Sequence, residues 1–180
     1  MKYDEVSVYD IPFVKVETSV LSWVEEALEL RHGAAGDPDG PLRQVGMEEG
    51  LHVVMNELVR TRNRSDRVDG LLAKATQAKG RARRAQEQAA FVASTAYDNA
   101  QVKAQANRLP QSFMTKEEKN AEAALGSFEE RRVAHTAERL VSITSEAYEV
   151  INQIHWQLNA IRTDLRAQIH AIQFENSLER

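Results

Sequence analysis

The chain has 180 residues, of which 42% are apolar but only 6% aromatic, a balance that favours one domain of helices packed through aliphatic side chains and alanines. It contains no cysteine, which excludes disulfides and thiolate metal sites. No apolar run approaches the roughly 18 residues of a membrane span, and the first residues lack the basic and apolar regions of a signal peptide. A cytoplasmic protein is therefore expected.

The formal net charge of -4 hides an uneven distribution along the chain. Residues 1–59 carry 4 basic and 12 acidic side chains, residues 60–109 carry 11 and 4, and residues 110–180 carry 8 and 11. An asymmetry of this kind accompanies a charged partner. It also fits a second arrangement, in which the acidic end of one subunit docks on the basic stretch of another.

An acidic N-terminal segment is predicted over residues 1–43. Valines alternate weakly over residues 5–17 and indicate one or two short strands, interrupted at Pro12. Thr18 or Ser19 is expected to cap a helix that stops near Gly33. The glycines and prolines that follow, up to Pro41, predict a loop.

A helical domain is predicted over residues 44–180, and it begins with a basic helix over 44–106. Alanine recurs every three or four residues from Ala75 to Ala100, which indicates a narrow, smooth seam that needs a partner helix. Gly70 and Gly80 are the expected kinks or breaks, because each costs about 1 kcal/mol against alanine within a helix.

The most informative feature of this basic helix is its cations. Arg60, Arg67, Lys74 and Arg81 recur at every seventh position, which places them on one slowly drifting ridge of a helix. Such a ridge is suited to a polyanion, and single-stranded nucleic acid is held by cations along its phosphates and by aromatics that stack its bases. The nearby aromatics are Phe91 and Tyr97. The full set of predicted nucleic-acid-binding residues is Arg60, Arg64, Arg67, Lys74, Lys79, Arg81, Arg83 and Arg84.

A loop is predicted over residues 107–114, followed by an assembly helix over 115–178. Thr115 and Glu118 form the pattern of a capping box, and Gly126 is a possible interruption. The apolar stripe near the C-terminus is wider than the seam of a dimeric coiled coil, so the helix is expected to bury two faces by oligomerising. The predicted oligomer interface comprises Ile151, Ile154, Trp156, Leu158, Ile161, Leu165, Ile169 and Ile172. The expected fold is thus mostly all-α: a long antiparallel helical hairpin that oligomerises through its C-terminal helix, with a short β-containing N-terminal segment.

No pattern typical of an enzyme is present. Phosphate-binding loops, nucleophile elbows and paired metal-binding histidines are all missing from the sequence. The five histidines are scattered, and His155 beside Trp156 is interpreted as a packing or interface residue. We therefore expect no catalysis, no metal and no cofactor.

The C-terminal run from Leu158 to Arg162, followed by Ile169 to Glu175, resembles the closing helix of the UvsY-like phage recombination mediators. The central run from Ala78 to Arg83 is similar to the basic Lys-x-Arg motif of that family, with Arg81 and Arg83 at the matching positions. The resemblance covers about residues 44–180. It implies a ring-like homo-oligomer, often a heptamer, that binds single-stranded DNA and helps a recombinase displace single-strand-binding protein.

Two functions follow from these observations. The first is a recombination mediator that binds single-stranded DNA and loads a recombinase. The second is a structural or adaptor coiled-coil protein of phage morphogenesis or regulation, whose basic helix docks on an acidic protein surface.

Overall fold

The computed structural model describes residues 13–32, 42–43, 45–106 and 115–178 of the chain. It contains four helices, α1 (Phe13–His32), α2 (Leu51–Ala106), α3 (Lys116–Gly126) and α4 (Phe128–Leu178). Helices account for 93% of the described residues, and no strand occurs among them. The expectation of a mostly α-helical chain is confirmed.

The chain divides into two compact units, and the two long helices contribute to both. Unit 1 comprises residues 1–17 and 78–144, and unit 2 comprises residues 18–77 and 145–180. Each unit is described by itself below.

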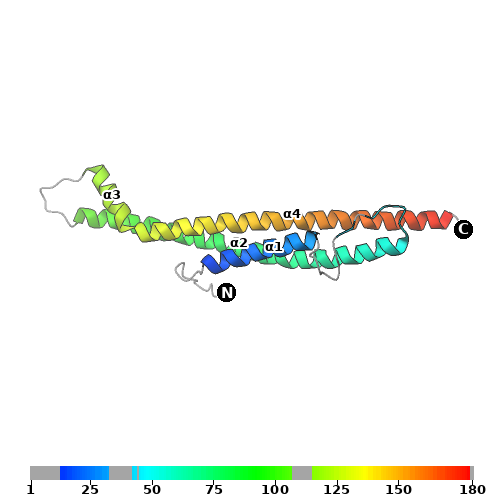
Figure 1. The fold of residues 1–180 in the computed structure, drawn as a ribbon. Helices are drawn as coiled ribbons and strands as arrows, with labels where there is room; N and C mark the ends of the chain where they lie inside the picture. Colours follow the sequence, from blue (N-terminus) through cyan, green and yellow to red (C-terminus); the bar gives the residue numbers. More distant parts are fainter. Residues whose placement is uncertain (1–12, 33–41, 44, 107–114, 179–180) are drawn as a thin grey trace, which may run out of the picture. The chain divides into compact units, whose positions relative to one another are not determined.

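Unit 2 is built from most of α1, the first half of α2 and the last two thirds of α4, which lie side by side (Figure 1). Its main core combines Ala27 and Leu30 of α1, Val68 and Leu71 of α2, and residues of α4 such as Ile151. These apolar side chains recur every three or four residues along each helix, so each helix turns one stripe inward. A second cluster joins Val45 and Val54 to Leu165.

Polar contacts between α2 and α4 show the relative direction of the two helices within unit 2. Asp69 Oδ1 lies 2.6 Å from His155 Nδ1, and the Ser65 hydroxyl donates to Asn159 Oδ1 over 3.5 Å. Because later residues of α2 meet earlier residues of α4, the two helices run antiparallel in this unit. The amide nitrogen of Asn159 also lies 2.8 Å from His155 Nε2, which links these contacts into one chain of polar side chains.

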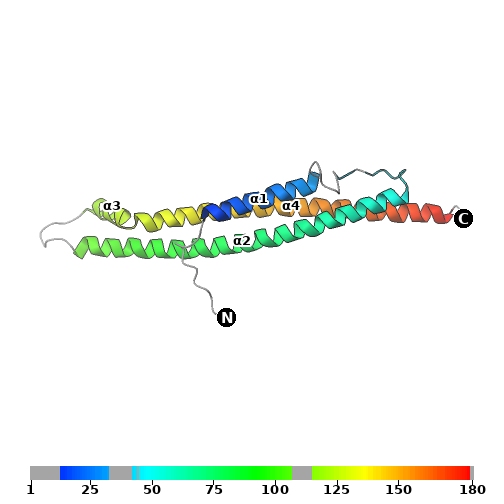
Figure 2. The ribbon, with the colours of Figure 1, turned by 60° about the horizontal axis from the view of Figure 1, so that its bottom comes forward.

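Unit 1 contains the second half of α2, helix α3 and the first third of α4, which Figure 2 shows from another side. The predicted alanine seam is confirmed here: Ala82, Ala85 and Ala89 are at most 5% exposed. The partner helix is α4, whose Ala137 is fully buried and clusters with Ala89. Small residues on both sides leave little apolar area to bury per turn.

The predicted start of α3 is confirmed in detail. The Thr115 hydroxyl accepts a hydrogen bond from the Glu118 backbone N–H, and the Glu118 carboxylate accepts one from the Thr115 N–H. The predicted interruption at Gly126 is also confirmed, because α3 ends there and α4 begins at Phe128. The Ser127 hydroxyl donates to the Ala123 carbonyl over 2.8 Å and stabilises the break.

Three expectations about the elements are corrected. Residues 13–17 belong to α1 rather than to a strand, and α1 begins ahead of the predicted cap at Thr18. The β-branched preference of two valines is weak, and the helical stripe that continues through Val20 and Ala27 outweighs it. The remainder of the predicted strand region, 5–12, lies outside the described residues, as do the predicted loops at 33–41 and 107–114.

The other two corrections concern α2. This helix begins at Leu51, seven residues after the expected start near Gln44, because a turn at Gly46 and Gly50 comes first. It then runs through Gly70 and Gly80 as one helix, so neither glycine breaks it. A glycine lowers the stability of a helix locally, but the packing of neighbouring turns holds the helix together.

Candidate nucleic-acid interface

The predicted basic residues fall into two groups, because α2 passes from unit 2 into unit 1. Unit 2 holds Arg60, Arg64, Arg67 and Lys74, and unit 1 holds Lys79, Arg81, Arg83 and Arg84. The environments of the two groups differ.

In unit 2 the arginines are occupied by contacts within the chain. Arg60 Nη1 lies 2.9 Å from Glu57 Oε1, and Arg67 Nη2 lies 3.4 Å from Glu26 Oε1 on α1. Arg64 is only 1% exposed, and its Nη1 donates to the Leu30 carbonyl over 3.2 Å. A cation near the C-terminus of α1 is favourable because the last carbonyls of a helix carry partial negative charge.

These contacts correct the expectation that Arg64 stands on an exposed ridge. Its side chain lies beneath α1, so the buried guanidinium is not accessible to a phosphate in this structure. Lys74 is exposed and remains the one accessible cation of this group that lacks a described ion-pair partner.

In unit 1 the situation is the reverse. Arg81, Arg83 and Arg84 are exposed, and no hydrogen bond or ion pair joins their guanidinium groups to the described residues. Lys79 is half-buried and does have an interaction partner. The helix places the three arginines on its outer side because the neighbouring Ala82 and Ala85 turn inward.

These three arginines form the candidate interface. Arginine presents five donors in a rigid fork that matches a phosphate, and it keeps its charge at any physiological pH. Desolvating such an unpaired, exposed guanidinium breaks no existing ion pair. The group can therefore hold the backbone of a nucleic acid at little cost to the fold.

A second basic feature of unit 1 was not found from the sequence. A hollow of about 530 Å³ on α4 is lined by one aromatic, three arginines, a histidine and a threonine. The lining residues are Phe128, Arg131, Arg132, His135, Thr136 and Arg139. They recur every three or four residues, and this spacing is the signal that could have revealed one helix face.

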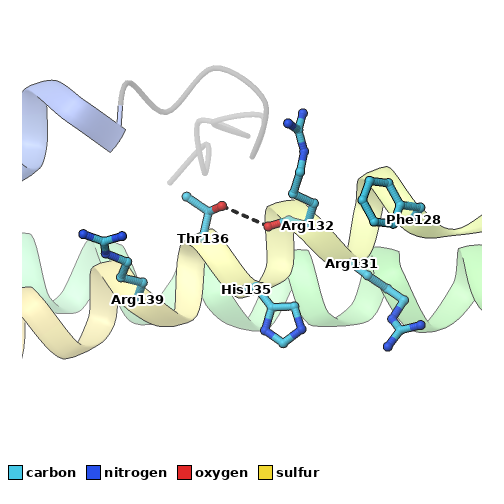
Figure 3. A pocket seen from close by; sticks show the side chains of 6 residues that line it. All are labelled: Phe128, Arg131, Arg132, His135, Thr136 and Arg139. Atoms are coloured by element: carbon cyan, nitrogen blue, oxygen red, sulfur yellow. Dashed lines mark hydrogen bonds between the residues drawn. The ribbon is translucent and has the colours of Figure 1, made fainter. Parts of the chain in front are cut away.

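The cations of this hollow do not converge on one point. Figure 3 shows that the Arg131 and Arg132 side chains point away from each other. Three of the basic groups also have acidic partners: Arg132 lies 2.8 Å from Glu129, Arg139 lies 3.5 Å from Glu17, and His135 lies 3.5 Å from Glu138. The hollow is therefore a weaker candidate than the α2 arginines.

The predicted oligomer interface is placed differently from the expectation. Ile151, Ile154, Leu158 and Leu165 are at most 4% exposed and belong to the core of unit 2. Ile169 and Ile172 pack against the second cluster of that unit. Trp156 and Ile161 remain exposed, at 65% and 36%. The rings of Trp156 and His155 pack edge to face, with their centroids 5.7 Å apart.

Among the described residues, no group of three or more histidines and carboxylates is arranged to hold a metal ion. None of the helices in the described ranges is both long and apolar enough to cross a membrane. Comparison of the chain with protein-family models, with curated proteins and with solved structures finds no match.

Proposed function

We propose that this protein is a non-enzymatic, homo-oligomeric protein that binds single-stranded DNA through Arg81, Arg83 and Arg84. One observation carries the proposal: the guanidinium groups of these three arginines, which lie within four residues of α2, are exposed and have no partner among the described residues. Binding of this kind is mainly electrostatic, so it is weakly selective for sequence and falls with salt.

The expected salt dependence is small for one chain. Each phosphate contact contributes a slope of about 0.7 to the plot of log affinity against log salt, so three contacts give a slope of about 2. Several copies that present the arginines to one strand bind far more tightly, because the later contacts form at high effective concentration. The proposal therefore includes the antiparallel hairpin and its assembly through α4, with Trp156 and Ile161 as exposed contact residues.

The finer assignment, a recombination mediator that helps a recombinase displace single-strand-binding protein in the cytoplasm, is supported by the sequence resemblance. In that resemblance Arg81 and Arg83 occupy the positions of the DNA-contacting motif. The exposure of both side chains is compatible with this role.

The experiment is a fluorescence anisotropy titration of a labelled single-stranded oligonucleotide at moderate salt. Arg81→Ala combined with Arg83→Ala is expected to weaken binding about tenfold or more and to lower the salt slope by about 1.4, since two phosphate contacts are lost. The oligomer mass should be unchanged because both side chains are exposed.

A matched control removes the same charge elsewhere in unit 1. Lys103 and Lys116 are exposed and have no described ion-pair partner. Lys103→Ala combined with Lys116→Ala should therefore change affinity and salt slope much less. Equal losses in the two variants would contradict a localised interface, and an unchanged affinity of the Arg81 and Arg83 variant would reject it.

A second function is favoured by a different observation. In unit 2 two of the α2 arginines take carboxylate partners: Arg60 pairs with Glu57, and Arg67 pairs with Glu26 of α1. A basic helix whose arginines pair with carboxylates of its own chain can also pair with carboxylates on the surface of an acidic protein. This is the adaptor function. Light scattering separates the two: an adaptor changes its mass with salt and ignores an added oligonucleotide, whereas a DNA-binding protein gains mass with the oligonucleotide.

A further inference from the structure

Phe91 is an exposed aromatic on the same side of α2 as the three arginines. Its side chain is 72% exposed, although a phenylalanine without a partner is normally buried. It lies seven residues after Arg84, or two helical turns and about 10 Å along the axis. Because seven residues return nearly to the same angle, Phe91 and Arg84 share one face of the helix.

This face points away from the packed side of unit 1. Ala82, Ala85 and Ala89 define the buried stripe of α2, and Phe91 lies almost opposite to them around the helix. The Thr95 hydroxyl, one turn further on, donates to the Phe91 carbonyl over 3.0 Å and so is directed at the backbone. The Phe91 ring therefore remains largely exposed.

The other nearby aromatic does not have this freedom. Tyr97 is half-buried, and its hydroxyl donates to Asn120 Oδ1 over 3.3 Å. The two aromatic residues identified from the sequence therefore differ in accessibility. Of the two, Phe91 is the one that can accept a stacked base beside the arginines.

The charges on this face of α2 determine where phosphates and bases are favoured along the helix. Positive charge is concentrated over residues 81–84, while the exposed Glu87 lies one turn before Phe91 and the exposed Asp98 lies two turns after it. Carboxylates repel phosphates, so phosphates are favoured at the arginines and disfavoured around the ring. An uncharged base suits the position of Phe91.

We infer that Phe91 is a base-stacking platform and that it makes the α2 interface selective for single-stranded over double-stranded nucleic acid. Bases of a single strand can turn outward and stack on an aromatic ring, whereas bases of a duplex are already stacked and paired. This inference rests on the proposed function, because it takes Arg81, Arg83 and Arg84 as the phosphate contacts.

The test compares Phe91→Ala with the parent protein by anisotropy, using a labelled oligothymidine strand and a duplex of equal length. A stacked base contributes enough that its loss should weaken single-strand binding about 5- to 100-fold. Duplex binding should change less than twofold, so the single-strand preference falls. Phe91→Trp should retain single-strand binding and show quenching of the added indole on titration with the strand.

Two controls isolate the stacking. Leu125→Ala removes another exposed apolar side chain of unit 1, which is 77% exposed but lies on α3, and it should leave single-strand affinity unchanged. A strand that lacks bases should bind the parent protein and Phe91→Ala equally. Circular dichroism should show the same helix content in every variant, since both side chains are exposed.

Other outcomes overturn the inference in distinguishable ways. Salt-dependent binding of the strand that is unchanged by Phe91→Ala removes the stacking role and leaves the proposed function intact. A lower oligomer mass for Phe91→Ala makes the ring a contact between copies instead. A parent protein that binds neither strand nor duplex rejects the proposed function, and the stacking role with it.

Discussion

At the scale of single residues, Arg64 shows how a sequence pattern can mislead about accessibility. It lies one turn from Arg60 and Arg67 in a strongly basic segment, yet its side chain is 1% exposed. Whether a cation on an amphipathic helix is solvated depends on which neighbour covers it, and α1 covers this one. The sequence shows the charge but cannot show that an acidic helix about 35 residues earlier packs over it.

We also expect mutation of Arg64 to have an unusual effect on the free energy of unfolding. Its Nε and Nη2 atoms are buried without a hydrogen-bond partner among the described residues. Because desolvating a charge is costly and apolar replacements of similar volume are often neutral or stabilising, we expect Arg64→Met to keep or raise the free energy of unfolding. Arg64→Ala should lower it by about 2 kcal/mol, since it leaves a cavity. Urea denaturation followed by circular dichroism measures both.

Comparing Arg64→Met with Arg64→Ala separates the effect of removing the charge from the effect of removing side-chain volume. A loss of more than about 2 kcal/mol in Arg64→Met would show that the hydrogen bond to the Leu30 carbonyl stabilises unit 2 beyond what apolar packing can replace.

At the scale of helices, local signals predicted the boundaries that depend on short-range contacts. The capping box at Thr115 and the break at Gly126 both follow from residues within a few positions of each boundary. The start of α1 was missed because two valines suggested a strand, while the packing of α1 on α2 and α4 decided the outcome. Long-range packing of this kind leaves no local trace in a sequence.

The glycines give a prediction at this scale. At Gly80, within α2, an added Cβ would meet nothing within 4 Å, whereas at Gly126 it would lie 3.0 Å from the Ala100 Cβ. Gly80→Ala should therefore stabilise the protein by about 0.5–1 kcal/mol, because alanine loses less entropy in a helix. Gly126→Val should destabilise it by about 1–3 kcal/mol through overpacking.

Thermal denaturation of both variants measures this contrast. Ala100→Gly added to Gly126→Val should recover part of the loss, since it removes the opposing methyl group. Failure to recover any of it would place the strain elsewhere in the break between α3 and α4.

At the scale of the whole molecule, the heptad pattern of α4 identified a buried stripe but not its partner. Ile151, Leu158 and Leu165 are buried against helices of the same chain, although their spacing equally suits contacts between copies. Periodicity reports that a face is covered, and it contains no information on which chain covers it. In the same way, the spacing of the arginines could not show that those of unit 2 are engaged and those of unit 1 are open.

Two neighbouring residues of α4 separate folding from assembly. Leu158 is fully buried, so Leu158→Ala should lower the free energy of unfolding by about 2–5 kcal/mol. Trp156 is 65% exposed, so Trp156→Ala should change it by less than about 0.5 kcal/mol. If Trp156 anchors a contact between copies, its removal should instead lower the mass measured by light scattering.

The parent protein provides the reference for this comparison. A parent mass equal to one chain would contradict the proposed homo-oligomer, and an unaltered mass in Trp156→Ala would exclude that side chain as the anchor.

The alanine seam of unit 1 leaves the axial alignment of its helices weakly specified. Alanine methyl groups do not interlock, so sliding α2 along its neighbours by one turn would place other alanines in contact at little cost. Two features oppose such slippage: the close approach of Ala100 to Gly126, and the Asn120 oxygen, which accepts from both the Tyr97 hydroxyl and the Gln101 amide. The alanine seam alone would allow several axial alignments of these helices. The few contacts near the end of α2 therefore select one of them.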